Sequence, residues 1–195
     1  MPAESCAARH VNWSSPCGSL TIASLNGELL LCDWTSGWHA AKRARRIDRL
    51  VGCRFEPGSS PLIERTIQEL EEYFAGRRRS FEDIPLHFAG TDFQQRVWRA
   101  LLSVPYGRTA TYGEIARAAG SPAAVRATGV AVGDNPFSII VPCHRVIGRD
   151  GSLVGYGGGY KAKKLLLALE LGCPVEQLPY PMPRALPRKH AAEAA

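Results

Sequence analysis

The chain has 195 residues, of which 45% are hydrophobic, and it carries a formal net charge of +6 at pH 7. This length suffices for one ordinary domain or two small ones, and the hydrophobic content excludes global disorder. No apolar run approaches the roughly 20 residues that a membrane span needs, and the N-terminus MPAESCAARH lacks the apolar stretch of a signal peptide. We therefore expect a cytoplasmic (or nucleoid or nuclear) protein that is not secreted and has no membrane partner.

The positive charge is concentrated in the second half of the chain. Residues 1–90 hold 11 Lys/Arg and 11 Asp/Glu, whereas residues 91–175 hold 10 and 5. A basic excess confined to one part suggests a polyanionic partner, with nucleic acid first. A basic surface without such a partner explains the charge equally well.

The six cysteines include no CxxC pair, and in a reducing compartment we expect them to be free thiols. The potential zinc ligands of the N-terminal half are Cys6, Cys17, Cys32, His39, Cys53 and His87. Their spacings match no paired-ligand signature, so the sequence predicts neither a metal site nor a cofactor.

The N-terminal elements predict a small α/β unit. Two apolar runs within residues 19–34 flank Asn26-Gly27, which predicts a two-residue β-hairpin. Residues 39–49 are basic and weakly patterned, which favours a solvated segment over a nucleic-acid arm. Residues 59–76 predict a helix with the apolar stripe Ile63, Ile67, Leu70 and Phe74.

This helix has clear end signals, since Ser60 can cap its start, Pro61 suits the first turn and Gly76 can end it. Residues 77–90 then resemble a linker, and we place a domain boundary at its end.

The second part opens with a predicted helix over residues 91–104, capped by Thr91. A further helix over 109–120 contains the capping box Thr111-x-x-Glu114. Another, PAAVRATGVAV, follows at once and ends at Gly133. Two short helices joined by a tight turn predict a helix-turn-helix.

The remaining segments are shorter. Residues 137–141 predict a short buried strand or extended segment, and residues 145–156 a hairpin around Arg149-Asp150-Gly151. A last helix is predicted over 161–172. The tail from Pro174 has five prolines and is expected to be disordered or loosely attached.

Cys143 and His144 stand side by side in the motif VPCHRV. A thiol is nucleophilic only as thiolate, and a free cysteine has a pKa of about 8.5, so a nearby imidazole would help to activate it. Neighbours in a strand point to opposite faces, so the pair needs a sharp turn or a linking water. A buried, unreactive cysteine is the default alternative.

Two further residues are candidates to support this pair. Glu170 lies among leucines and is either on an exposed helix face, which is the commoner case, or a buried acid with a partner. Asn135 precedes the apolar run that leads to Cys143 and could brace its turn. The glycine-dense loop GYGGGY, residues 155–160, lacks nucleotide-binding signatures but suits a backbone that closes over a flat ligand.

The second helix of the predicted helix-turn-helix consists almost entirely of small residues. Between Gly120 and Gly133 its one long charged side chain is Arg126, and its small residues are Ala123, Ala124, Ala127, Gly129 and Ala131. Such a helix can approach DNA closely but has little with which to read bases. Tight packing in a core explains the pattern equally well.

These motifs resemble those of the O6-alkylguanine-DNA alkyltransferases. IVPCHRVIGRDGSLVGYGGG is similar to their active-site motif, and TATYGEIARAAGSPAAVRATGVAVGDNPF to their helix-turn-helix and asparagine hinge. The match runs from about Phe93 to Gly172 and extends more loosely to the N-terminal hairpin. The resemblance implies an α/β N-terminal unit (1–90) and a Pro/Ala-rich tail (174–195). Between them it implies a mostly α C-terminal domain (91–173), which contains a helix-turn-helix and an active-site loop or short hairpin.

The resemblance also implies catalytic roles. Cys143 would accept the alkyl group, and His144 would act as its base through a water. Glu170 would orient His144, and Asn135 would be the hinge residue.

The implied DNA and substrate contacts are Tyr112, Arg126, Ala127, Gly129, Val146, Tyr156, Gly157 and Lys163. Arg126 would fill the gap left by a flipped base, and Tyr112 would push on the flipped nucleotide. Tyr156 would wall the pocket, which the backbone around Val146 and Gly157 completes. Relatives carry Ser where this chain has Gly157, so a side-chain contact to the guanine oxygen is missing.

The implied function is DNA repair by direct reversal. An alkyl group would pass from O6-alkylguanine, and from O4-alkylthymine, irreversibly to the protein's own cysteine in a single turnover with base flipping. The implied partner is double-stranded DNA, bound in the minor groove by a monomer with little sequence specificity. Two rivals remain at this stage: a thiol hydrolase using Cys143 and His144, and a DNA-binding regulator using only the helix pair.

Overall fold

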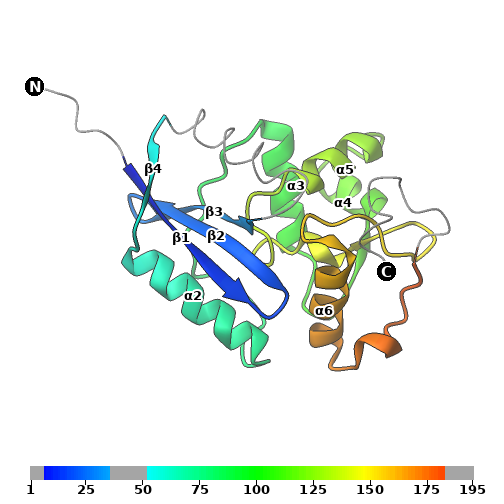
Figure 1. Ribbon diagram of the computed structural model, residues 1–195. Coiled ribbons are helices and arrows are strands. Elements are labelled where there is room, and N and C mark those ends of the chain that lie inside the picture. Colours follow the sequence, from blue (N-terminus) through cyan, green and yellow to red (C-terminus); the bar gives the residue numbers. More distant parts are fainter. Residues whose placement is uncertain (1–6, 36–51, 183–195) are drawn as a thin grey trace, which may run out of the picture.

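The computed structural model describes residues 7–35 and 52–182. A four-stranded sheet with one long helix lies on one side of the molecule, and the helices of the C-terminal part lie on the other (Figure 1). An α/β N-terminal unit and a mostly α C-terminal domain are therefore both present, as predicted.

The sheet is built around the predicted hairpin. Its strands are β1 (Ala7–Ser15), β2 (Gly18–Leu25), β3 (Glu28–Trp34) and β4 (Arg54–Pro57), in the order β3-β2-β1-β4. β4 is parallel to β1, and the other pairs are antiparallel. Asn26 and Gly27 join β2 to β3 with φ values of 50° and 82°. Two successive positive φ values are what a two-residue hairpin turn requires, so this prediction is confirmed.

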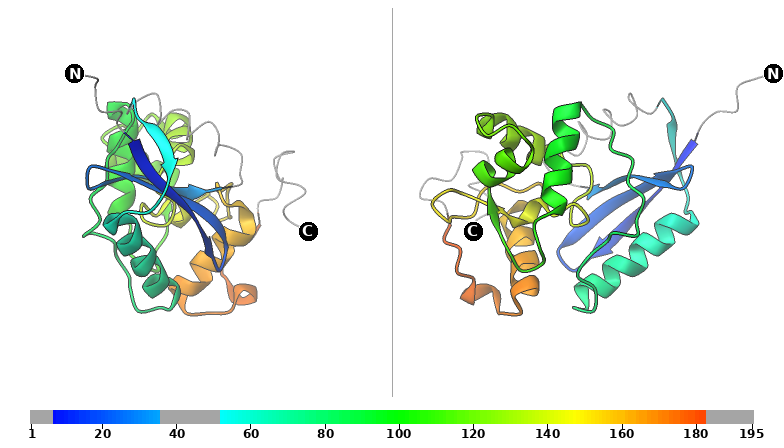
Figure 2. Two further views of the ribbon diagram at one scale, coloured as in Figure 1. Left: turned by 60° about the vertical axis from the view of Figure 1, so that its left-hand side comes forward. Right: turned by 180° about the vertical axis from the view of Figure 1, so that it is seen from behind.

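Helix α2 (Pro61–Phe74) runs along one face of this sheet (Figure 2). The Ser60 side chain accepts a hydrogen bond from the backbone N–H of Ile63, and Gly76 follows the helix with a φ of 72°. The predicted start and end of the helix are therefore confirmed. Ile63 and Leu70 are fully buried, and the other two residues of the predicted stripe pack against the same core.

The predicted linker over residues 77–90 is packed into the fold. Phe81, Ile84 and Ala89 are buried. The backbone of Leu29 on β3 donates to Pro85 O at 2.8 Å and accepts from His87 N at 2.9 Å. One hydrophobic cluster also takes residues from both parts of the chain. The boundary at residue 90 stays a prediction, but the segment is a packed connection and not a free spacer.

The C-terminal part contains the predicted helices. They are α3 (Asp92–Leu102), α4 (Tyr112–Ala118), α5 (Val125–Gly133) and α6 (Gly159–Leu171). The capping box of Thr111 and Glu114 is formed at the start of α4. Helix α5 begins at Val125, later than predicted, because the residues after Gly120 form a turn before the helix starts.

Two predicted strand segments differ from the structure. Within residues 137–141 only Phe137 makes a bridge, to Cys32, and Ile139 adopts a φ of 73° in a turn. The apolar run is buried by packing and not by strand pairing. β6 (Val146–Ile147) pairs in parallel with β5 (Ala110–Thr111), and not with a second hairpin arm.

The tail beyond Pro174 is attached as far as residue 182, so the prediction of a loose segment is wrong there. The short 3₁₀-helix η2 (Val175–Gln177) follows α6. The backbone of Leu153 donates to Pro181 O at 2.8 Å. The side chains that pack on the small cluster of Leu153, Tyr160 and Leu167 are Leu178, Tyr180 and Met182. Residues 183–195 and the basic segment 39–49 lie outside the described residues.

The expectation of free thiols is confirmed for Cys17, Cys32, Cys143 and Cys173. It is wrong for Cys53, which is disulfide-bonded. In the described ranges, no helix has the length and apolar character that crossing a membrane requires.

Candidate active site

Cys143 is the first residue of a tight turn. Residues Cys143–Arg145 form a 3₁₀ turn, η1, in which Arg145 N donates to Pro142 O at 3.0 Å, and Cys143 N donates to Val141 O at 2.7 Å just before it. The turn supplies the sharp change of direction that a strand could not. Cys143 is 8% exposed, so the residue is largely shielded from solvent.

Asn135 holds this turn from inside. Its Nδ2 donates to Val141 O at 2.9 Å and to Cys143 Sγ at 3.1 Å, and its Oδ1 accepts from Phe137 N at 3.0 Å. The amide is itself buried. One side chain therefore links the start of the segment, at Phe137, to Cys143 at its end.

His144 and Glu170 form a buried pair. His144 Nε2 lies 2.8 Å from Glu170 Oε1, and both side chains are 0% exposed. The carboxylate can only accept, so Nε2 carries the proton and Nδ1 keeps its lone pair. Nδ1 is buried and has no hydrogen-bond partner among the described residues. The commoner expectation, an exposed Glu170, does not hold.

The surroundings of this pair favour a neutral imidazole and an ionised carboxylate. Burial lowers the pKa of His144 below its ordinary value, although the hydrogen bond and charge of Glu170 oppose that effect. His144 is therefore neutral at pH 7. Burial alone would raise the pKa of Glu170, but His144 and Arg145 outweigh it and lower that pKa well below the usual range. Glu170 thus stays a carboxylate.

Arg145 is a site residue that the sequence analysis missed. Its Nε lies 3.0 Å from Glu170 Oε2 and one terminal nitrogen lies 2.9 Å from Oε1, while the other donates to Val104 O at 2.6 Å. The backbone of Gly107 adds a donor to Oε2 at 3.1 Å. A buried carboxylate needs such compensation. The sequence signal that could have pointed to Arg145 is its position directly after Cys143 and His144.

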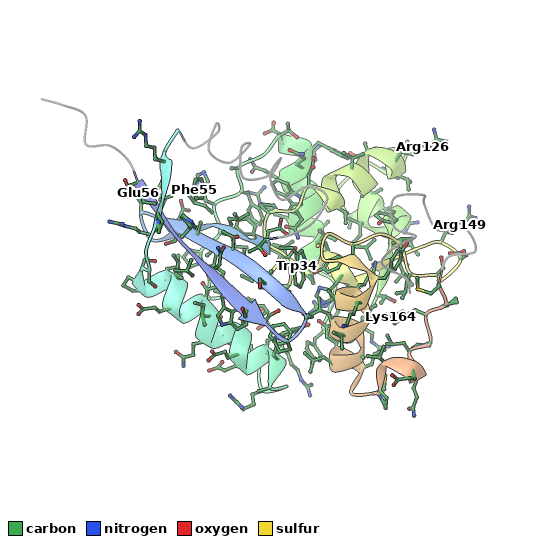
Figure 3. All side chains as sticks on the ribbon, viewed as in Figure 1. Trp34, Phe55, Glu56, Arg126, Arg149 and Lys164 are labelled. Atoms are coloured by element: carbon green, nitrogen blue, oxygen red, sulfur yellow. The ribbon has the colours of Figure 1, made fainter. Side chains whose placement is uncertain are left out.

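The predicted pocket wall lies next to this pair. The Tyr156 ring stands edge-on to His144, with centroids 6.3 Å apart, and edge-on to Trp34 at 5.8 Å. Trp34, labelled in Figure 3, also covers Gly158, where a Cβ would lie 2.4 Å from its indole. Gly157, between these contacts, is half-buried. The glycine-dense loop is therefore pressed against the N-terminal sheet.

Lys163 lies under the same loop, fully buried. Its Nζ donates to the carbonyl oxygens of Val146 and Val154. Burial lowers the pKa of Lys163 to about 7, an effect that a negative charge on Cys143 would oppose. The lysine thus fixes the backbone around Val146, as a structural support close to the cysteine.

The helix-turn-helix lies next to the cysteine at Tyr112. Tyr112 is half-buried at the start of α4, and burial first, and a negative charge on Cys143 second, raise its pKa to about 12, so its hydroxyl stays protonated. A Cβ at Gly129 would lie 3.7 Å from its ring. Arg126 and Ala127 are exposed on α5, and Arg126 projects outward in Figure 3. The structure does not bring these two residues into the cysteine cluster.

The exposed face of α5 is small and apolar apart from Arg126. Val125 and Val130 are 40% and 64% exposed. The opposite face of α5 is buried through Thr128, Ala131 and Val132, so the alternative of a helix packed on the core with Arg126 pointing out stays open beside DNA binding. No cluster of potential metal ligands occurs within residues 7–35 and 52–182.

The sequence and the structure were compared with those of known proteins. The family described as "6-O-methylguanine DNA methyltransferase, DNA binding domain" matches residues 92–172. A protein of Mycobacterium tuberculosis named methylated-DNA–protein-cysteine methyltransferase is 59% identical over 104 residues, which are 53% of this chain and 62% of that protein. The chain thus spans about three fifths of that relative's length.

Two further matches are more extensive. The protein of the same name from Mycolicibacterium paratuberculosis is 50% identical over 63% of this chain and 77% of its own length. A crystal structure of Mycobacterium tuberculosis OGT in complex with DNA superposes with a TM-score of 0.70 at 43% identity, covering 86% of this chain and 95% of the other. The chain therefore belongs to the family of the methylated-DNA–protein-cysteine methyltransferases.

Proposed function

We propose that this protein repairs DNA by moving an alkyl group from the O6 atom of guanine onto Sγ of Cys143. The observation that carries the proposal is the fully buried His144–Glu170 pair directly after a braced, nearly buried cysteine. The names of the relatives and the DNA complex of one of them support the same activity.

The chemistry follows from the protonation states. The thiol proton of Cys143 passes, through a water, to the free Nδ1 of His144, and Glu170 stabilises the imidazolium that forms. The thiolate attacks the alkyl carbon, the S–C bond forms and the C–O bond breaks. Guanine leaves with the electron pair and takes back the proton from His144. Water does not hydrolyse the thioether product, so each molecule acts once.

The reaction on duplex DNA requires the base to leave the stack, at a cost of a few kcal/mol. The small exposed face of α5 suits close approach to the minor groove with little sequence specificity, and Arg126 is the side chain long enough to occupy the vacated space. Ala127 and Gly129 keep the approach open. Tyr112 supports the flipped nucleotide.

The flipped base would enter against Tyr156, with the backbone of Val146 and Gly157 completing the pocket and Lys163 holding it from beneath. Because Gly157 has no side chain, contacts on that side come from the backbone alone. We include O4-alkylthymine as a second substrate and propose that the protein acts as a cytoplasmic (or nucleoid or nuclear) monomer.

A comparison of wild type with Cys143→Ala tests this function. With duplex DNA containing O6-methylguanine, the wild type should restore unmodified guanine, while the variant should bind the same DNA without repairing it, because the groove contacts lie elsewhere. A thiol hydrolase would instead turn over repeatedly on an ester or amide. A purely DNA-binding regulator would show no Cys143-dependent repair.

A further inference from the structure

The N-terminal unit contributes a side chain to the buried cluster around Glu170. The hydroxyl of Tyr73, on α2, donates to Glu170 Oε1 at 2.8 Å, although the two residues are 97 positions apart. This is the same oxygen that accepts from His144 Nε2, also at 2.8 Å. Tyr73 is 0% exposed, so water does not compete for its hydroxyl.

The ring of Tyr73 is held in place by neighbours from both parts of the chain. Its centroid lies 5.4 Å from that of Phe74, 5.6 Å from Phe81 and 6.1 Å from Tyr106. Edge and tilted contacts of this kind fix the ring plane and therefore the direction of the hydroxyl. Burial first, and the charge of Glu170 second, raise the pKa of Tyr73 well above its ordinary value. The group therefore remains a donor.

We propose that Tyr73 is a positioning residue for alkyl transfer, which holds Glu170 Oε1 in place and thereby sets the orientation and basicity of His144. The proposal rests on the proposed function. It makes the N-terminal unit a part of the site, because α2 supplies a third donor to Glu170 Oε1 beside His144 and Arg145.

Loss of the Tyr73 hydroxyl should change the pKa of His144, because both groups bind the same carboxylate oxygen. Three donors converge on this oxygen: Tyr73, His144 and Arg145. When the hydroxyl is removed, the carboxylate has more negative charge to offer the imidazolium of His144. The pKa of His144 should then rise, and the ring should also be less firmly oriented. A residue that merely fills space would produce neither effect.

The test is Tyr73→Phe, with Tyr106→Phe as the matched control. Tyr106 belongs to the same aromatic group, but its hydroxyl donates to the backbone oxygen of Leu169 at 3.4 Å and not to Glu170. Both variants lose one hydroxyl and keep the ring. The first measurement is the rate of alkyl transfer from duplex DNA carrying O6-methylguanine, between about pH 5 and about pH 8.

For Tyr73→Phe we expect the rate at its alkaline plateau to fall about three- to tenfold. The acid limb of the profile should move up by about half a pH unit or more. Tyr106→Phe should match the wild type in both respects. DNA affinity should be the same for all three proteins. An unmoved acid limb in Tyr73→Phe, or an equal displacement in Tyr106→Phe, would overturn the proposal even if the plateau rate fell.

The second measurement is independent of repair. The titration of His144 is followed by NMR of its imidazole Cε1–H in the DNA-free protein, for the same three proteins. A higher midpoint in Tyr73→Phe alone is the expected result, and equal midpoints would overturn the proposal. If the wild type failed to transfer an alkyl group, the proposed function would fall, while this titration would still show whether Tyr73 controls the protonation of His144.

Discussion

His144 Nε2 and Glu170 Oε1 are 2.8 Å apart inside the protein, with neither side chain open to solvent. Their closeness makes the carboxylate the natural stabiliser of an imidazolium at His144. The two come from different elements, the η1 turn and α6, so these two elements must pack together to form the pair.

Replacement of that carboxylate should impair chemistry and leave binding intact. Glu170→Gln keeps the shape but removes the charge that stabilises protonated His144, so transfer should slow by about 10- to 100-fold. Single-turnover kinetics with alkylated duplex DNA would measure the rate, and a binding titration the affinity. Glu69→Gln is the control, since Glu69 is a buried acid on α2 that pairs with Arg65 and Arg78 away from the site. Equal slowing in both variants would indicate general damage to the fold.

Arg126 should matter for base extrusion more than for affinity. Arg126→Ala should slow repair of alkylated guanine in duplex DNA, whereas reaction with the free alkylated base, which needs no extrusion, should be nearly unchanged. Other basic residues still neutralise phosphates. Arg117→Ala, which removes an exposed charge from α4, is the control and should slow neither reaction by as much. If Arg126→Ala slowed both reactions equally, Arg126 would support the pocket or the fold instead.

Asn135 should be needed for both stability and reactivity. Asn135→Ala removes the hydrogen bonds to Val141 and Phe137 and takes away the side-chain acceptor of the buried Phe137 N–H, so the free energy of unfolding should fall by about 1–3 kcal/mol. The folded fraction of the Asn135→Ala variant should also transfer the alkyl group more slowly than the wild type, because the amide contacts Cys143 Sγ. Urea denaturation and transfer kinetics measure the two effects. Asn12→Ala, which removes an exposed amide from β1, should change neither. Unchanged stability in Asn135→Ala would rule out the bracing role.

Lys163 should make stability depend on pH in a specific direction. Burial lowers the pKa of Lys163 from 10.5 to about 7 in the folded protein. Between these values the unfolded chain binds the proton and the folded one does not, so the free energy of unfolding should increase as the pH rises. Denaturation at intervals from about pH 7 to about pH 8, below the pKa of about 8.5 of an unperturbed thiol, would show this increase.

The matching variants isolate the contribution of Lys163. Lys163→Met should flatten the increase, whereas Lys164→Met should keep it, because Lys164 lies on α6 with its side chain partly exposed (Figure 3). A wild-type free energy of unfolding that falls over the same pH range would contradict the assignment.

The parts of the fold that could be predicted are those that local chemistry determines. Asn26-Gly27 requires positive φ values, and Ser60 and Thr111 offer oxygens to the first free N–H groups of a helix. Each signal acts within four residues. The hairpin and helix ends were therefore predictable from short stretches of sequence.

The parts that could not be predicted depend on contacts between distant residues. The apolar run after Phe137 resembles a strand, but its burial comes from packing and Ile139 sits in a turn. Glu170 was expected on an exposed face because the donors that compensate its burial, above all Arg145 and Tyr73, come from elsewhere in the chain. No periodicity in the sequence of α6 reveals those partners.

The most direct test of the central claim is the intact mass of the protein after incubation with excess duplex DNA containing O6-methylguanine. Single-use transfer predicts a gain of one methyl group per molecule, located on the peptide that holds Cys143, and one repaired guanine per protein with no further turnover. An unmodified protein, a methyl group on another cysteine, or more repaired guanines than protein molecules would contradict the account.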